Sequence, residues 1–308
     1  MHQGIQRLRE SMAGVLFGGG RSIDRVICCL LARGHLLIED VPGVGKTLLA
    51  TALARSVDCT FSRIQMTPDF LPSDLVGITI LDKNTGEFVF KKGPLFANIV
   101  LADEINRTPP RTQAALLEAM NEAAVSMDGA TYPLDPPFMV VATQNPFEFE
   151  GTYPLPENQL DRFLMRIRLG YPDPAAEARV LEVRPSQKPL HDLRPVLRRA
   201  EVVRMQEDVD GVRVDRSLIE YMVALAGASR VHEGLLHGLS PRGALSLSQA
   251  ARAWAYMDGR DYVIPEDITE NLLPVCGHRI VAKGVMPGEA GAGERIWREI
   301  LSGVPSPV

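Results

Sequence analysis

The sequence is poor in cysteine and contains no long apolar run. Its four cysteines, Cys28, Cys29, Cys59 and Cys276, show no Cys-x-x-Cys spacing, so a disulfide scaffold is excluded and buried thiols in a reducing compartment are expected. No segment approaches the roughly 18 to 20 apolar residues of a membrane span. Residues 1–10 are polar and lack the apolar stretch of a signal peptide, and we therefore expect a cytoplasmic protein.

Basic residues are not in excess. Thirty-three Lys and Arg stand against 38 Asp and Glu, for a net charge of −5, so sequence-independent binding to nucleic acid is not expected as the main activity. With 45% hydrophobic and 23% charged residues, the composition is that of a soluble globular protein. At about 150 residues per domain, a chain of 308 residues suggests two domains.

The sequence also lacks a zinc-protease motif, although one segment resembles it. His232-Glu-Gly-Leu-Leu-His237 has one residue more than the His-Glu-x-x-His pattern. On a helix, this spacing places the two imidazoles about 140° apart around the axis, so they cannot share one metal ion. We expect no zinc site.

The first half of the chain alternates between short apolar runs and helical patterns. This alternation is typical of strands and helices in a parallel α/β sheet. The expected strands are residues 35–39, 99–102, 139–143 and 165–169, and the expected helices are residues 46–55 and 112–123.

Two segments interrupt this alternation and are predicted to be β-hairpins. Residues 77–81 and 87–91 flank a loop at residues 82–86, and residues 124–127 and 130–132 flank Asp128-Gly129. An Asp-Gly pair favours a tight type I′ turn. Both hairpins are interpreted as inserts in the α/β core, the alternative being ordinary connecting loops.

The character of the chain changes after residues 171–174. A polar connector is expected at residues 185–192, and residues 283–293 are rich in glycine and proline. The predicted helices are residues 175–183, 217–230, 241–256, 266–273 and 294–301. We therefore predict an α/β core at residues 1–172 and a smaller all-α domain at residues 173–308.

A glycine-rich turn joins the first expected strand to the first expected helix. Asp40-Val-Pro-Gly-Val-Gly-Lys-Thr47 has the strand–turn–helix context of a phosphate-binding P-loop, with Asp40 in place of the usual first glycine. Lys46 can reach the β- and γ-phosphates of ATP, and the Thr47 hydroxyl can bind Mg²⁺. The predicted nucleotide-binding residues of the turn are Pro42, Gly43, Val44, Gly45, Lys46, Thr47 and Leu48.

Two acids follow the second expected strand. Asp103 and Glu104 lie at the carboxyl end of residues 99–102, the end that faces the phosphates in a P-loop protein. Successive strand residues point to opposite sides, so the two acids can divide the work. Asp103 is predicted to hold Mg²⁺ through water, and Glu104 to orient and polarise the attacking water.

These motifs resemble those of the MoxR family of AAA+ ATPases. The resemblance covers residues 23–280, with its most specific stretches at residues 37–47, 101–110 and 142–163, and the family shares Asp40 at the start of its P-loop. It implies an α/β P-loop AAA+ core with a parallel sheet and β-hairpin inserts, followed by a smaller all-α lid domain.

The resemblance assigns three further residues. Asn145 matches sensor 1, which positions the lytic water, and Arg242 matches sensor 2. Arg162 matches the arginine finger that one subunit supplies to its neighbour's nucleotide, and the working form that the resemblance implies is a ring, expected to be a hexamer. From the residues alone, a lone arginine is usually a solvated or salt-bridged side chain, so both roles rest on the resemblance. Whether Arg242 acts on its own subunit's nucleotide stays open.

The resemblance also implies a function. It suggests a chaperone-like remodeller of proteins or complexes, with partners that contain von Willebrand factor A domains. In related proteins such hairpins contact the substrate in the ring pore, here through Phe88, Val89, Phe90 and Lys91, although these residues could instead pack the insert against the core. The alternatives are a motor subunit of magnesium-chelatase type and a nucleic-acid motor, which the acidic balance and the lack of a recognisable DNA-binding module disfavour.

Overall fold

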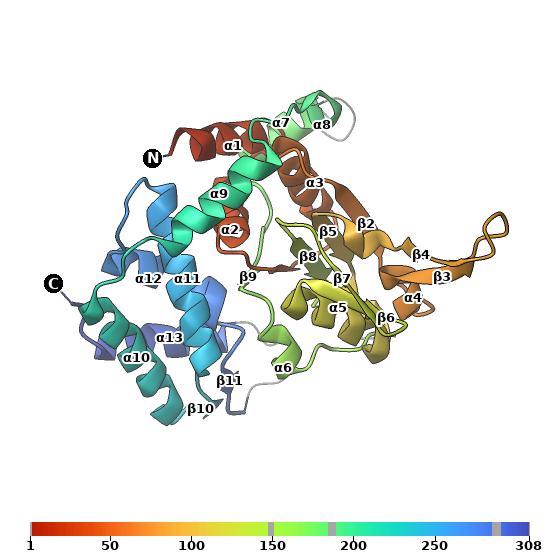
Figure 1. Ribbon diagram of the computed structural model, residues 1–308. Coiled ribbons are helices and arrows are strands. Elements are labelled where there is room, and N and C mark those ends of the chain that lie inside the picture. The colour runs from red at the N-terminus through yellow and green to blue at the C-terminus, as the bar shows by residue number, and fades with distance from the viewer. Residues whose placement is uncertain (1, 147–150, 184–188, 285–290, 308) are drawn as a thin grey trace.

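The computed structural model describes residues 2–146, 151–183, 189–284 and 291–307 (Figure 1). A five-stranded parallel sheet lies at its centre, in the order β2, β5, β8, β1, β9. The strands are β1 (Leu36–Glu39), β2 (Phe61–Gln65), β5 (Ile99–Asp103), β8 (Met139–Gln144) and β9 (Met165–Ile167). All four strands expected from apolar runs are present, with closely similar bounds.

Strand β2 is not predicted by the apolar pattern. Only Ile64 of its residues is fully buried, because β2 lies at the edge of the sheet and pairs with β5 alone. An edge strand needs fewer apolar residues than a central one. Its register places Gln65 opposite Asp103, so the polar end of β2 lies beside the predicted acids.

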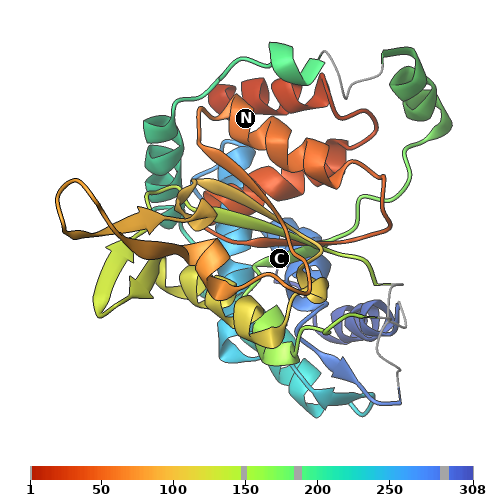
Figure 2. The ribbon, with the colours of Figure 1, turned by 90° about the vertical axis from the view of Figure 1, so that its right-hand side faces the viewer.

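Helices cover both faces of the sheet (Figure 2). Leu36 and Ile38 of β1 pack into one apolar cluster, together with α1 (Gln3–Ala13), α2 (Gly20–Leu31) and α3 (Lys46–Ser56). The residue between them, Leu37, packs into a second cluster with α4 (Pro72–Val76) and α5 (Pro110–Glu122). Alternate residues of a strand thus serve opposite faces, as a parallel sheet covered by helices requires.

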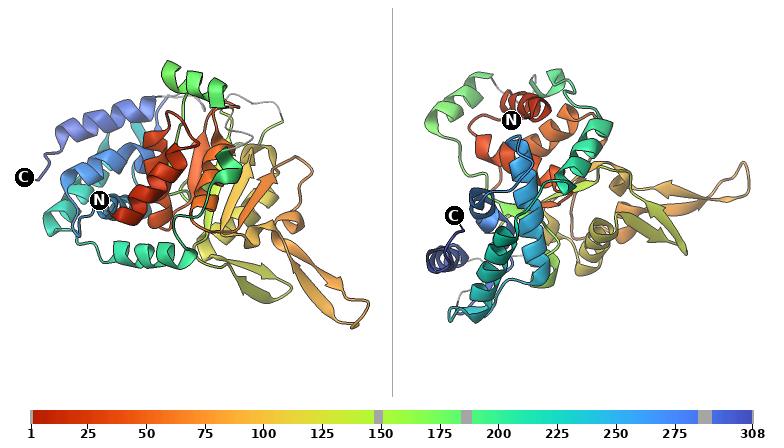
Figure 3. Two further views of the ribbon diagram at one scale, coloured as in Figure 1. Left: turned by 90° about the horizontal axis from the view of Figure 1, so that it is seen from above. Right: turned by 60° about the vertical axis from the view of Figure 1, so that its left-hand side comes forward.

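Both predicted hairpins are present and extend from the core on the side away from helices α10–α13 (Figures 1 and 3). The first consists of β3 (Gly77–Leu81) and β4 (Phe88–Lys92), and the second of β6 (Ala124–Met127) and β7 (Ala130–Pro133). The tight turn of the second hairpin has positive φ at both central residues, Asp128 (50°) and Gly129 (77°), as a type I′ turn requires.

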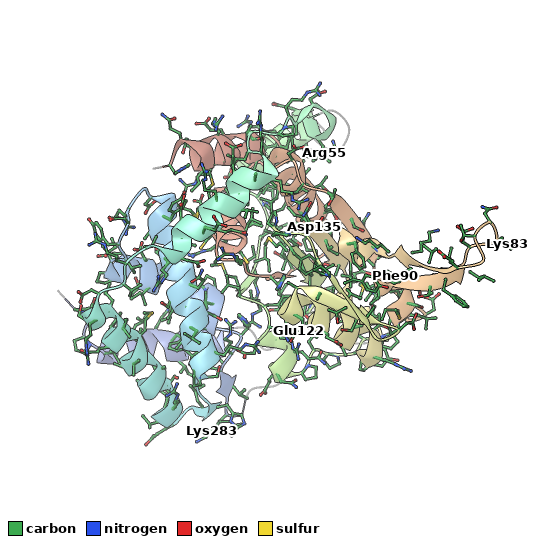
Figure 4. The ribbon with its side chains drawn as sticks, viewed as in Figure 1. Arg55, Lys83, Phe90, Glu122, Asp135 and Lys283 are labelled. Atoms are coloured by element: carbon green, nitrogen blue, oxygen red, sulfur yellow. The ribbon has the colours of Figure 1, made fainter. Side chains whose placement is uncertain are left out.

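The two hairpins contact each other. The ring of Phe90 stacks on Tyr132 with centroids 4.3 Å apart, and Thr79 Oγ1 donates to Asp128 Oδ2 over 2.6 Å. Phe90 thus packs at the base of the first hairpin, while Lys83 marks its tip (Figure 4). Phe88, by contrast, is 77% exposed. Of the residues predicted to contact a substrate, Phe90 therefore packs against the second hairpin, whereas Phe88 faces solvent.

The second half of the chain is mainly helical. The predicted connector lies outside the described residues at 185–188, as does the tail at 285–290. Residues 189–192, predicted to belong to the connector, instead form helix α8. Helix α9 and a two-stranded sheet of β10 (Leu235–His237) and β11 (Val281–Ala282) are also present but were not predicted. The helices are α7 (Pro174–Val183), α8 (Pro189–Asp192), α9 (Arg199–Asp210), α10 (Arg216–Val231), α11 (Pro241–Met257), α12 (Pro265–Cys276) and α13 (Ala292–Gly303).

The cysteines are all free thiols. Cys28, Cys29 and Cys276 are buried, and burial raises the pKa of the Cys28 and Cys276 thiols to about 12. Cys59 is only partly buried, unlike the others. Among the described residues, no helix is both long and apolar enough to cross a bilayer.

His35, at the start of β1, forms hydrogen bonds to β8 and α5. From its environment we predict how the stability of the protein depends on pH. Its Nδ1 accepts from Val140 N over 3.0 Å, so its Nε2–H donates to Met120 O over 2.9 Å, and the ring is neutral. Burial lowers the pKa of His35 from its usual 6.5 to about 4. The unfolded chain therefore binds a proton at higher pH than the folded protein does.

The contribution of His35 to the free energy of unfolding is expected to be fully present above pH ~6.5. It should fall by up to about 1.4 kcal/mol per pH unit as the pH drops toward ~4. Because other buried groups also titrate, the control is His35→Asn measured over the same range by chemical denaturation. The variant should be less stable at pH 7.5, and the gap to wild type should narrow by about 2 kcal/mol near pH 4.5. A gap that does not change with pH would contradict this role.

Candidate active site

The phosphate-binding turn has the strand–turn–helix context that its sequence predicts. Strand β1 ends at Glu39 and α3 begins at Lys46. Gly43 and Gly45 have φ of 88° and 95°, in the left-handed region that favours glycine, which allows the N–H groups of the turn to point toward one anion. Lys46 Nζ donates to the Asp40 carbonyl over 2.8 Å. The amino end of α3 and this lysine together suit a chain of phosphates.

Asp40 does more than serve the turn. Its Oδ1 accepts from Val41 N over 2.8 Å, and its Oδ2 accepts from both Leu169 N and Gly170 N over 2.8 Å. The carboxylate therefore ties the beginning of the P-loop to the segment that follows β9. Glycine has no side chain to accept these bonds, so aspartate has a structural role at the position where glycine is usual.

Replacing Asp40 with alanine is expected to lower the free energy of unfolding by about 1–3 kcal/mol, because backbone N–H groups at residues 169 and 170 lose their acceptor. Chemical denaturation measures this change. The matched control is Asp261→Ala, whose carboxylate is 77% exposed and pairs with Arg213 at the surface. That change should stay within about 0.5 kcal/mol of wild type, and equal losses in the two variants would contradict the role of Asp40.

Asp103 is held in place at the end of β5. It is 8% exposed, its Oδ1 accepts from Thr143 Oγ1 over 2.6 Å, and its Oδ2 pairs with Arg63 Nη2 over 2.8 Å. Thr143 belongs to β8 and Arg63 to β2, so the strands on both sides of β5 orient this carboxylate.

The alternation of side chains along a strand, which was predicted to separate the two acids, does not extend to Glu104. Strand β5 ends at Asp103, and Glu104 adopts a left-handed conformation with φ 59° and ψ 50°. Its N–H donates to Thr143 Oγ1 over 3.0 Å, and its Oε2 accepts from Gln65 Nε2 over 2.8 Å and pairs with Arg107 Nε at 3.2 Å. A non-glycine residue in this region is uncommon and often lies at a functional site.

A cleft of about 1020 Å³ brings most of the predicted residues together. Val44 of the turn does not line it. Arg63 lines it as well, and was missed because β2 was not predicted; its signal is the period-two pattern in which Arg63 and Gln65 flank Ile64. The predicted residues that line the cleft are Pro42, Gly43, Gly45, Lys46, Thr47, Leu48, Asp103, Glu104 and Asn145.

The two predicted arginines lie outside this cleft. Arg162 follows α6 (Glu157–Leu160), and its Nη1 donates to the Leu117 carbonyl over 2.9 Å. Arg242, in the first turn of α11, is exposed, and its Nη2 donates to Asn121 Oδ1 over 3.3 Å. Leu117 and Asn121 lie one turn apart on α5. The arginines therefore lie beside the same helix, away from their own subunit's P-loop.

The donor set of the cleft fits Mg²⁺. The Thr47 hydroxyl and the Asp103 carboxylate both line it, and Mg²⁺ prefers such oxygen ligands. The guanidinium of Arg63 lies against Asp103 at 2.8 Å, so this carboxylate already accommodates a positive charge.

Two family profiles match separate parts of the chain. The profile of the ATPase family associated with various cellular activities (AAA) matches residues 35–165, and that of the AAA lid domain matches residues 227–300. The chain superimposes on the crystal structure of a candidate ATPase from Cytophaga hutchinsonii with a TM-score of 0.91 and 39% identity, covering 99% of this chain and 95% of that one.

Named relatives extend along nearly the whole chain. The uncharacterized protein YeaC of Bacillus subtilis (strain 168) is 50% identical over 100% of this chain and 96% of its own length. Chaperone MoxR1 of Mycobacterium tuberculosis is 43% identical over 90% of this chain and 75% of its own length.

The magnesium-chelatase subunit ChlI of Mesostigma viride is more distant, at 29% identity over 64% of this chain. The predicted P-loop core, parallel sheet and helical lid are confirmed by the fold and by the matching profiles. This chain is a member of the MoxR family of AAA+ ATPases.

Proposed function

We propose that this protein is an ATP-hydrolysing ring that remodels other proteins or complexes, acting in the cytoplasm. The observation that carries the proposal is the division of the predicted groups. The P-loop, both acids and Asn145 line one cleft, whereas Arg162 and Arg242 lie beside α5, outside it. A site divided in this way becomes complete when two subunits meet.

Within the cleft, Lys46 would neutralise the β- and γ-phosphates of ATP. Glu104, held by Gln65 and by its left-handed backbone, would orient the attacking water and accept its proton. Asn145, 8% exposed at the end of β8, would fix the position of that water near the γ-phosphate.

Thr47 and Asp103 would hold Mg²⁺. When bound, this ion would neutralise charge on the β- and γ-phosphate oxygens. Arg63, on the edge strand β2, pairs with Asp103 Oδ2 at 2.8 Å and would lie beside the ion that this carboxylate holds.

Arg162 would supply positive charge to the γ-phosphate of the neighbouring subunit. Arg242 contacts α5 one turn away from Arg162. This supports a role for Arg242 at the same neighbouring site, where both guanidinium groups would be close together. In a closed ring every site receives an arginine from its neighbour, and we propose six subunits because the resemblance to AAA+ proteins implies a hexamer.

Protein clients, including proteins with von Willebrand factor A domains, are proposed as partners. The apolar side chains exposed on the first hairpin support this proposal, because such surfaces commonly bind proteins. They are Ile78, Ile80, Leu81, Phe88 and Val89. The alternative of a magnesium-chelatase motor would require assembly with chelatase partner subunits, and the stronger similarity to MoxR proteins disfavours it.

The proposal is tested by measuring ATP turnover per subunit against protein concentration with Mg²⁺ present. A shared site predicts that turnover per subunit rises with concentration and reaches a plateau where light scattering reports the ring. EDTA should abolish turnover at the plateau. Turnover that is constant at every concentration, including those where the protein is monomeric, would contradict the divided site.

A further inference from the structure

We propose that Arg279 is a positioning residue for Arg162, joining the lid to the turn that presents this arginine to the neighbouring subunit. The inference rests on the proposed role of Arg162 in the shared site. Arg279 itself does not line the cleft at the P-loop. It acts through the backbone on both sides of Arg162.

The side chain of Arg279 is buried and binds the turn by all three of its guanidinium nitrogens. Its Nε donates to Asp161 Oδ1 over 2.8 Å, and its Nη2 donates to the carbonyls of Asp161 and Phe163 over 3.2 and 2.8 Å. Its Nη1 donates to the Leu164 carbonyl over 3.1 Å. The acceptors lie on both sides of Arg162, so the guanidinium holds the turn by its two ends.

A second contact from the lid holds the same turn. His278 Nε2 donates to the Phe163 carbonyl over 3.0 Å, and Phe163 is fully buried in the apolar cluster beneath α5. The backbone of the turn therefore has little freedom. The side chain of Arg162 is directed to the Leu117 carbonyl of α5.

The same guanidinium also contacts two lid helices. Arg279 lies three residues after the end of α12, and its Nη1 donates to the carbonyl of Val275 in the last turn of that helix. Its Nη2 also lies 3.3 Å from Ser246 Oγ on α11. Ser246 is one turn beyond Arg242 on the same helix, so Arg279 connects the elements that carry both arginines.

The geometry of the guanidinium explains why arginine is needed at this position. The Asp161 carboxylate and three carbonyls of the turn accept from one guanidinium, whose five N–H donors form a fixed fork that can bind several acceptors together. A lysine would keep the charge but offers only a single ammonium group. Removing the bonds would leave the turn free to shift, and a displacement of about 1 Å at a catalytic group can lower turnover by about 100-fold.

The test uses Arg279→Lys and the milder Asp161→Asn, with Arg162→Ala as the reference. Each is measured alone and mixed with an excess of Glu104→Gln subunits, which lack hydrolysis of their own but keep an intact Arg162. Alone, Arg279→Lys and Asp161→Asn should lose about 10- to 100-fold in turnover at saturating ATP. Their ATP affinity, measured by titration of a fluorescent ATP analogue, should change by less than about 2-fold.

Mixing should restore both variants, because their own P-loops are intact and the neighbour now supplies a well-placed arginine. Recovery is scored against wild type mixed with the same excess. If Arg162→Ala recovers but Arg279→Lys and Asp161→Asn do not, the defect lies in their own site or fold and the inference is overturned. If Arg162→Ala itself does not recover, the shared site fails, and the inference fails with it.

Arg260→Lys is the matched control for lid stability. Arg260 lies at the opposite end of α12 and makes two 2.7 Å bonds to the buried carboxylate of Asp267, away from the turn at residues 161–164. This variant should lower the melting temperature comparably while keeping wild-type turnover. An equal loss of turnover in Arg260→Lys would attribute the effect to lid stability and overturn the inference.

Discussion

Replacing Arg162 with alanine is expected to lower ATP turnover by about 10³-fold or more, while ATP binding stays unchanged, because an arginine supplied to a neighbour's γ-phosphate stabilises charge only in the transition state. Arg162 lies outside the cleft of its own subunit and donates to the Leu117 carbonyl on α5. Its removal therefore leaves every group around its own P-loop in place. Turnover is measured at concentrations where the ring is assembled.

The control for this prediction is Arg298→Ala, which removes a guanidinium that is 70% exposed on α13 and pairs with Glu294 at the surface. It should leave turnover unchanged. Light scattering must accompany both variants, because a failure to assemble would lower turnover for a different reason. Wild-type turnover by an assembled Arg162→Ala ring, or loss of its ATP binding, would contradict the role in trans.

The phosphate-binding turn could be predicted from sequence because its determinants are local. Gly43 and Gly45 lie between a buried strand and the helix that begins at Lys46, and their positive φ is a property of the turn itself. Asp103 could be placed for a similar reason, since it ends a continuous apolar strand.

The supports of the acids could not be predicted in this way. Arg63 and Gln65 reach Asp103 and Glu104 only because β2 pairs with β5 in a particular register, and that register is a property of the folded sheet. Strand β2 lies at the edge and buries only Ile64, so its apolar pattern is too weak to reveal it.

The convergence of Arg162 and Arg242 is likewise non-local. One follows a short helix of the core and the other opens a lid helix, yet both side chains contact α5 one turn apart. The local pattern around each arginine is compatible with an ordinary solvated side chain. Their common neighbour on α5, and the bonds of Arg279 between them, arise from the packing of the lid on the core.

Replacing Glu104 with glutamine is expected to lower the rate of hydrolysis by about 10²- to 10⁴-fold, because the amide cannot accept a proton from water at neutral pH. ATP should still bind, since the P-loop and Asp103 are unchanged. The amide oxygen can still accept from Gln65 Nε2, and the Glu104 N–H can still donate to Thr143, so the melting temperature should stay close to wild type.

Single-turnover measurement of phosphate release separates the chemical step from product release in this variant. The control is Glu118→Gln, the same change at an exposed position of α5, which should hydrolyse ATP at the wild-type rate. Wild-type hydrolysis by Glu104→Gln would place the base elsewhere, and loss of ATP binding would make Glu104 a binding group. If ATP binds but is not hydrolysed, the assembled ring stays in its ATP state. Its subunits then keep an intact Arg162, which they can supply to neighbours with an intact Glu104 when the two kinds of subunit are mixed in one ring.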